Sequence, residues 1–319
     1  ALAHNSRLAL AAVLIFGLLT GVLIITQADG LSRIVERVFL GGQSLADVTP
    51  LVRVLISIIF LRALLGWGSE VCARAVAANV KSDLRQRLFD KVLNLGPAYT
   101  RAERSGELVN TAMEGVEALD AYFSQYLPQL ALAALIPFSI LVAIFPRDAL
   151  SGAILLMTAP LIPVFMYLIG KTAEKLTRRQ WETLSRLSAH FLDSLQGLTT
   201  LKELGRSRDR AGSIKETSDR FRDVTLGVLR VTFLSALVLE MVGTVSTAVV
   251  AVEIGLRLLY GQMAFQQAFF ILLLAPEFYL PLRKLGLGFH SGMSGTTAAR
   301  RIFEILDLPT TLRPGNDLQ

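Results

Sequence analysis

The sequence contains very little cysteine and histidine. Cys72 is the only cysteine among 319 residues, so an intrachain disulfide and a metal site built from several cysteines are excluded. A lone thiol in apolar surroundings is usually a small buried side chain, and we expect no more of Cys72. The histidines are His4, His190 and His290. The sequence therefore predicts no metal site.

Familiar catalytic motifs are also missing. Neither GxSxG nor HExxH occurs, which argues against a membrane hydrolase, and we expect no catalytic residues. The run Gly170-Lys171-Thr172 imitates the end of a phosphate-binding GxxxxGK[ST] loop, but the leading glycine position holds Phe165. The run also ends an apolar segment and not a strand, so these 319 residues are expected to bind no ATP and to lack an ATPase site.

What the sequence has in abundance is apolar residues. They make up 52% of the chain and give a mean hydropathy of +0.51, values that indicate a membrane protein. The net charge of +6 and the pI of about 9.7 could suggest nucleic-acid binding. In membrane proteins, however, basic residues gather in cytoplasmic loops, and we expect no nucleic-acid partner.

The apolar residues fall into six blocks, each long enough to cross about 30 Å of hydrocarbon as a helix. The predicted fold class is all-α: a polytopic membrane protein with six transmembrane helices and two long cytoplasmic helical extensions. The predicted spans are residues 8–28, 51–72, 127–145, 149–170, 231–259 and 262–282.

The loops differ in charge on the two sides of the predicted membrane. Lysine and arginine occur seven times in residues 73–126, thirteen times in 171–230 and five times in 283–319, against three in the opposite loops. By the positive-inside rule, both termini and both long connections are cytoplasmic.

The two long connections keep helical periodicity. Val80, Leu84, Leu88 and Val92 repeat every four residues in the first, and the second has a similar stripe at Leu184, Leu187, Phe191 and Leu195. We expect each connection to be a helical hairpin that continues its flanking spans out of the membrane. The predicted breaks are at Gly96-Pro97, Gly106, Gly205 and Gly212.

This plan resembles the transmembrane domain of ABC exporters of the type I exporter fold. The stretch LGPAYTRAERSGELVNTAMEGVEALDAYF is similar to the first coupling-helix region of that family, with Gly106-Glu107-Leu108 after the tip, and LTTLKELGRSRDRAGSI is similar to the second. Residues implied to contact nucleotide-binding domains are Tyr99, Thr100, Arg101, Glu103, Gly106, Glu107, Gly205, Arg206, Arg208 and Asp209.

Four further stretches narrow the resemblance: YLPQLALAALIPFSILVAIFP, TAPLIPVFMYLIGK, RLSAHFLDSLQGLTTLKELGR and LLLAPEFYLPLRKLG. They are similar to the CydD subunits of the CydDC family, heterodimeric bacterial inner-membrane exporters of cysteine or glutathione that support cytochrome bd assembly. The resemblance implies a transmembrane domain over residues 1–308 and a linker over 309–319. The linker would lead towards an ATP-binding domain beyond this piece, which would bind ATP-Mg and make the full-length protein an ATP-hydrolysing translocase.

The same resemblance implies the partners. They are membrane lipid, the nucleotide-binding domains, a small thiol substrate and a second six-span subunit, CydC-like or, as the alternative, a second copy. Haem has been proposed as a ligand in this family, but none of the three histidines lies at membrane depth, so a histidine-ligated haem within the spans is unsupported.

Charges inside spans are candidate functional residues, because each costs about 2.5 to 3.5 kcal/mol to insert. Arg62, Glu240 and Glu277 are the candidates for a substrate cavity. For Arg62 two interpretations remain open: it recognises an anionic group of the substrate, or it pairs with a glutamate and fixes helix packing. Glu277 stands between Pro276 and Pro281, the candidate hinge residues of the last span.

The remaining charges have simpler interpretations. Glu253 and Arg257 form a favourable i, i+4 pair, and Glu70 is expected to be solvated or paired with Arg74 at the membrane boundary. Arg53, near an outer end, is expected to reach the headgroups.

Two other functions fit the same sequence. A lipid, peptide or haem exporter would have a largely apolar cavity, with Arg62 and Glu277 buried away from it. A membrane receptor or assembly scaffold without transport would lack fusion to an ATP-binding domain.

Overall fold

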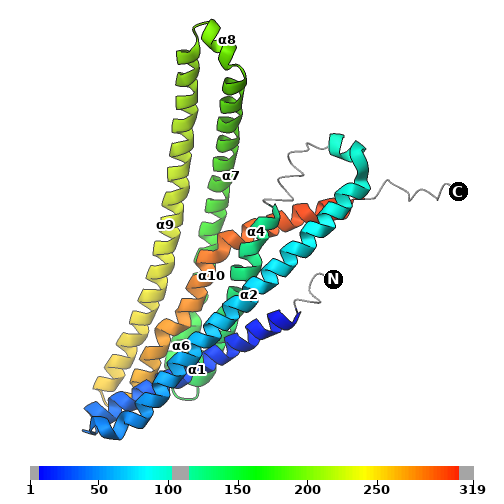
Figure 1. Cartoon of the computed structure of the whole chain (residues 1–319). Helices are drawn as coiled ribbons and strands as arrows, with labels where there is room; N and C mark the ends of the chain where they lie inside the picture. The colour runs from blue at the N-terminus through cyan, green and yellow to red at the C-terminus, as the bar shows by residue number, and fades with distance from the viewer. Residues whose placement is uncertain (1–6, 103–114, 309–319) are drawn as a thin grey trace, which may run out of the picture. The chain divides into compact units, whose positions relative to one another are not determined.

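The described residues form helices joined by short turns (Figure 1). The computed structural model describes residues 7–102 and 115–308, and within these residues it has no strand, so the all-α prediction is confirmed. The helices are α1 (Arg7–Phe39), α2 (Leu45–Ala102), α4 (Val116–Ala121), the π-helix η2 (Tyr122–Tyr126), α5 (Leu127–Ile144), α6 (Ala149–Thr158), α7 (Leu161–Gln196), α8 (Leu198–Glu203), α9 (Ser207–Leu259) and α10 (Phe265–Leu306).

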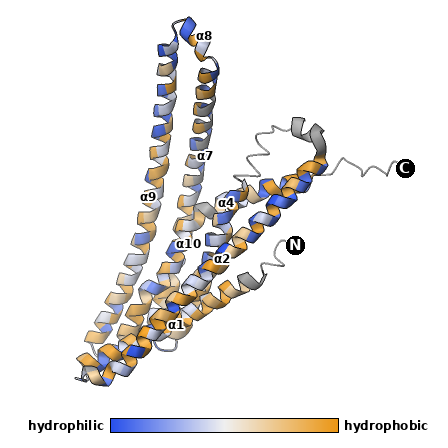
Figure 2. Ribbon diagram, in the orientation of Figure 1, coloured by the Kyte–Doolittle hydropathy of each residue, from blue (hydrophilic) through white to orange (hydrophobic). Residues whose placement is uncertain are grey.

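Six segments are long and apolar enough to cross a membrane, which confirms the predicted number of spans. Figure 2 shows the hydropathy changing along α9, from mixed and hydrophilic next to α8 to hydrophobic towards its other end. The candidate segments are Ala11–Phe39, Ala46–Leu95, Val116–Ile144, Ala149–Leu184, Ser207–Leu259 and Phe265–Phe289.

The fourth span, predicted over residues 149–170, contains a break in its helix. It is broken at Ala159 and Pro160, where α6 ends and α7 begins. Pro160 supplies no N–H to the preceding turn of helix, which explains why α6 ends here.

The chain divides into two compact units at the same place, one of residues 1–160 and 243–319 and the other of residues 161–242. In the first unit, α1 packs against α2, α5 and α10, and α10 also packs against α5. The first unit thus contains its own helix-to-helix interior, and it holds the candidate site described below.

A hydrophobic cluster joins α2, α4 and α10 within the first unit. Val80, Leu84 and Leu88 are buried, as their spacing predicts, and Val92 of the same stripe is half-buried. They pack with Val76, Val116, Leu119, Ile302 and Ile305. Lys81 of α2 adds ion pairs to Glu117, at 2.9 Å, and Asp120, at 2.7 Å.

The predicted break at Gly96-Pro97 is wrong, because α2 continues through these residues to Ala102. A proline inside a helix removes one hydrogen bond and strains the preceding turn, at a cost of about 3 kcal/mol. Burial of Leu88 and Leu95 on the same helix counteracts that cost. The predicted break at Gly106 lies outside the described residues.

The second unit is a helical hairpin in which α7 and α9 lie side by side and α8 caps the tip (Figure 1). Gln180 donates to Thr225 at 3.0 Å and Arg210 donates to Ser194 at 2.9 Å, which links the two long helices. Gly205 follows α8 with a φ of +68°, a conformation that favours glycine.

The tip of the hairpin comprises residues 197–206, and the predicted break at Gly205 is confirmed. Gly212 does not break the chain, since α9 runs through it; one glycine inside a helix costs only about 1 kcal/mol. The predicted stripe on α7 is only half covered: Leu184 and Leu187 are partly buried, whereas Phe191 and Leu195 are each 53% exposed.

Candidate functional site

A cavity of about 630 Å³ lies within the first unit. Four helical segments supply its walls: α1, α2, η2 with α5, and α10. The α2 residues that line it recur at helical spacing, so one face of that helix points to the cavity. These are Arg62, Gly66, Ser69, Glu70 and Ala73.

Arg62 and Glu277 meet at the wall of this cavity. Nη2 of Arg62 donates to both carboxylate oxygens of Glu277 at 2.8 Å, and Nη1 donates to Oε1 of Gln27 at 3.2 Å. The two charged side chains are 28% and 27% exposed. This cluster ties α1, α2 and α10 together, and both charged groups keep access to the cavity.

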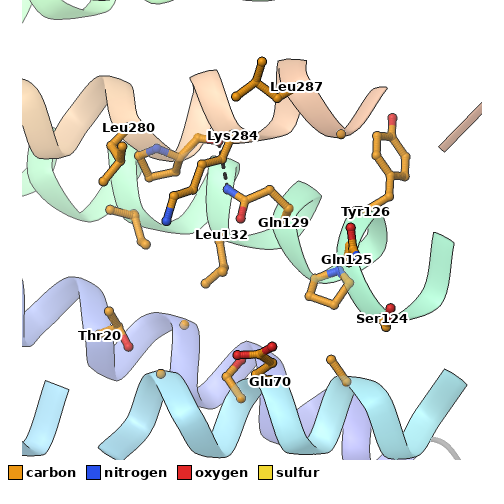
Figure 3. A pocket seen from close by; sticks show the side chains of 18 of the residues that line it. Thr20, Glu70, Ser124, Gln125, Tyr126, Gln129, Leu132, Leu280, Lys284 and Leu287 are labelled. Atoms are coloured by element: carbon orange, nitrogen blue, oxygen red, sulfur yellow. Dashed lines mark hydrogen bonds between the residues drawn. The ribbon is translucent and has the colours of Figure 1, made fainter. Parts of the chain in front are cut away.

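Two further charged residues line the same cavity, although neither was predicted to do so. Figure 3 shows Lys284 reaching into the space from α10 and Glu70 on the facing wall. Glu70 pairs with Arg74 at 2.5 Å, as its spacing predicts. Lys284 forms no ion pair with any residue that the structure describes. Helical spacing was the available signal, because Glu70 is eight residues after Arg62 and Lys284 is seven after Glu277.

The third predicted cavity residue, Glu240, belongs to the second unit. Arg62 and Glu277 belong to the first. The candidate hinge residues Pro276 and Pro281 both lie inside α10, and the helix continues through them. Pro281 also lines the cavity, and its carbonyl oxygen accepts a hydrogen bond from Nε2 of Gln129 at 2.9 Å.

The predicted coupling residues of the second connection all lie at the exposed tip of the hairpin. Arg206 and Asp209 pair at 3.6 Å, and each is 75% exposed. Gly205 precedes α9, and Arg208 stands in its first turn. In the first connection, Tyr99, Thr100 and Arg101 end α2, whereas Glu103, Gly106 and Glu107 lie outside the described residues.

The residues that resemble a phosphate-binding loop do not fit ATP. Gly170, Lys171 and Thr172 lie inside α7, where backbone N–H groups are engaged in the helix and form no phosphate cradle. For haem, no group of three or more potential metal-ligating side chains occurs in residues 7–102 and 115–308. His190 lies on α7 in the second unit.

A second charged cluster surrounds the turn between α5 and α6. The predicted pair of Arg257 and Glu253 is present at 2.7 Å, and Arg257 also donates to both oxygens of Asp148, at 2.9 and 3.0 Å. Asp148 caps the N-terminus of α6 by accepting from the backbone N–H of Ser151 at 3.1 Å. Burial works to raise the pKa of Asp148, but the hydrogen bonds from Arg257 and Ser151 outweigh it and hold the pKa below its usual value.

Comparison with known families decides the classification. The sequence pattern of the ABC transporter transmembrane region matches residues 10–281. The chain belongs to this family. Membership in the ABC transporter family agrees with the six candidate spans and with the long helices that extend beyond the predicted spans.

Individual members of the ABC transporter family show which branch the chain is similar to. It is 35% identical to the glutathione/L-cysteine transport system ATP-binding/permease protein CydC of Bacillus subtilis over 90% of this chain and 50% of that protein. It is also 35% identical to the glutathione/L-cysteine transport system ATP-binding/permease protein CydD of Escherichia coli, over 92% of this chain and 52% of that protein. A fatty acid ABC transporter ATP-binding/permease protein of Mycobacterium tuberculosis is 25% identical over 84% and 42%. The chain thus spans about half the length of the curated relatives it matches.

Proposed function

We propose that this chain is the membrane-spanning part of an ABC exporter that moves a small thiol, cysteine or glutathione, out of the cytoplasm and so supports cytochrome bd assembly. The observation that carries the proposal is the cavity itself, which is lined by two cationic and two anionic side chains. Both thiols are zwitterions, and a cavity with charges of both signs suits a zwitterion better than an apolar molecule.

The names of the relatives support the choice of substrate. Two relatives at 35% identity are described as glutathione/L-cysteine transport proteins. A lipid exporter on the same scaffold is less well supported, since its cavity should be largely apolar and should exclude Arg62 and Glu277. Both residues line this cavity.

The orientation belongs to the same proposal. The excess of basic residues in the long connections supports a cytoplasmic position for them and for both termini, in a bacterium. Residues 1–308 then form the transmembrane domain, and residues 309–319 lead towards an ATP-binding domain that hydrolyses ATP-Mg. That domain would press on residues near 97–107 and on the tip at 197–206, and α2, α7 and α9 would pass the motion to the spans.

A second six-span subunit is expected to complete the transporter. Phe191, Leu192 and Leu195 of α7 are each more than half exposed, although they lie outside the predicted membrane spans. Apolar side chains that face neither lipid nor a core are typical of a protein contact. We propose a CydC-like partner or, alternatively, a second copy of this chain.

The test is thiol uptake into inverted membrane vesicles that contain the full-length protein with its partner subunit. We expect ATP-dependent accumulation of cysteine and glutathione. Glu277→Gln should stay folded, because the amide oxygen can still accept from Arg62, but it should lower uptake about tenfold because one charge of the cavity is lost.

Glu216→Gln is the matched control, since Glu216 lies 77% exposed on α9 and should leave uptake unchanged. Accumulation of another solute but of neither thiol would overturn the proposed substrate. Unchanged uptake by Glu277→Gln would show that the Arg62 pair serves helix packing alone.

A further inference from the structure

The charges of the cavity form two levels along α2 and α10. Arg62 and Glu277 meet at the first level, and Glu70 and Lys284 face the cavity at the second. Seven residues separate Glu277 from Lys284, which corresponds to about 10 Å along a helix. A single amino acid spans about 3.5 Å of extended chain, whereas three residues span about 10 Å. The Cα positions of the two levels on α10 are therefore about one extended tripeptide apart.

The first level can accept an amino-acid head group without losing its own ion pair. A guanidinium has five N–H donors, and among the described residues Arg62 donates to Gln27 through Nη1 and to Glu277 through Nη2. The carboxylate of Glu277 likewise has lone pairs left for an ammonium group. An α-carboxylate can bind Arg62 while the neighbouring α-ammonium binds Glu277.

The second level carries an uncompensated cation. Glu70 already has a partner in Arg74, at 2.5 Å, whereas Lys284 has no ion pair within residues 7–102 and 115–308. Its ammonium group reaches into the cavity (Figure 3). A lysine in this position offers a point charge with three N–H donors to an anionic group of the ligand.

We propose that Lys284 is a specificity-determining residue that binds the second carboxylate of a tripeptide-sized thiol, while Arg62 and Glu277 hold its amino-acid head group. Glutathione has this chemistry, with an amino-acid head on its γ-glutamyl end and a carboxylate on its glycine end. Cysteine has the head group alone and lacks a second carboxylate for Lys284. The inference rests on the proposed function and makes this site selective for glutathione over cysteine.

The experiment compares three ligands in inverted vesicles that contain the full-length protein and its partner subunit. They are cysteine, glutathione and the glutathione ester blocked only at the glycine carboxylate. We expect wild-type protein to take up glutathione with a KM about tenfold below that of the ester. Lys284→Gln should raise the KM for glutathione about tenfold and leave the values for the ester and cysteine within about twofold.

Two variants serve as controls. Lys284→Arg keeps the positive charge and should retain the preference for glutathione over the ester. Lys215→Gln removes an exposed lysine of α9 and should change none of the three values.

The outcomes separate the inference from the proposed function. If wild-type vesicles accumulate neither thiol with ATP, the proposed function fails, and the inference fails with it. If both thiols accumulate but Lys284→Gln affects glutathione and its ester equally, or affects neither, the proposed function stands and the assignment of Lys284 is overturned.

Discussion

One arginine faces two carboxylates at the turn between α5 and α6. Arg257, Asp148 and Glu253 have side chains that are only 24%, 6% and 15% exposed. If all three are ionised, the cluster carries one uncompensated negative charge. The hydroxyl of Ser151 contacts both carboxylates, but it has one proton and can donate to only one of them. Neutralising Glu253 should therefore destabilise the protein less than neutralising Asp148.

Removing each of the three charges should change the stability of the protein by a different amount. Glu253→Gln relieves the excess charge and lets an amide donate to Ser151, so thermal stability should stay equal or rise slightly. Asp148→Asn keeps the helix cap, because asparagine caps a helix about as well as aspartate, but it removes the charge partner of Arg257 and should cost about 1 kcal/mol. Arg257→Gln leaves two carboxylates together and should cost the most, about 3 kcal/mol.

The measurement is the apparent unfolding temperature of the full-length protein in detergent, with the three variants compared side by side. A loss for Glu253→Gln as large as that for Arg257→Gln would show that both carboxylates are required as charges.

The candidate site could be predicted in part at this scale. Arg62 and Glu277 stand out because a charge inside an apolar run is costly and needs a reason. Glu70 and Lys284 give no such signal, because a charge at the edge of a span costs little. Their place in the cavity depends on which faces of α2 and α10 point inward, and this is set by packing between residues distant in the sequence.

At the scale of elements, α10 packs closely on the π-helix η2. Two glycines of α10 make this approach possible: a Cβ atom on Gly295 would lie 2.5 Å from Cβ of Tyr122, and one on Gly292 would lie 2.8 Å from ring atoms of Tyr126. Tyr126 lines the cavity. The contact therefore couples the part of α10 beyond the predicted span to the candidate site.

The two glycines should differ in how an added methyl group is accommodated. Cβ of Tyr122 is fixed to its backbone, so Gly295→Ala should force η2 and α10 apart and destabilise the protein by about 1 to 3 kcal/mol. The ring of Tyr126 can rotate away, so Gly292→Ala should cost less stability but should change thiol uptake by altering the cavity wall.

Gly227→Ala is the control for both glycines, because a Cβ atom there meets nothing within 4 Å and should stabilise α9 by up to about 1 kcal/mol. Unfolding temperature and vesicle uptake measured on all three variants check the prediction. Equal stability of Gly295→Ala and Gly227→Ala would contradict it.

Helices were predictable from the sequence, whereas the contacts between them were not. Apolar blocks and four-residue spacing identify the six spans and the buried stripe of α2, because both patterns are local. The sequence did not predict that α2 continues past Pro97 or that the helix breaks at Pro160. A proline can either end a helix or be accommodated inside it, and the packing around it decides which occurs. The contact of α10 with α4 and η2 joins residues more than 150 positions apart, for which spacing along the chain gives no signal.

At the scale of the whole molecule, the orientation in the membrane determines which end of the cavity a substrate enters. Six spans would place both termini on one side, and from the unequal charge of the loops we propose that this side is the cytoplasm. The two long connections would then lie where ATP is available. With the opposite orientation, an ATP-binding domain following residue 319 would be outside the cell.

Single-cysteine labelling checks this orientation, because Cys72 is the only native thiol and Cys72→Ser gives a background without cysteine. Gln43→Cys, in the exposed turn between α1 and α2, should react with a membrane-impermeant maleimide in intact spheroplasts. Arg208→Cys, on the exposed start of α9, should react only after the membrane is opened. Labelling in inverted vesicles should give the reverse pattern, which controls for the reactivity of each thiol.

If Arg208→Cys is labelled in intact spheroplasts and Gln43→Cys is protected, the tip of the hairpin faces outward. No cytoplasmic ATP-binding domain could then press on it, and the proposal of an ATP-driven exporter would fail.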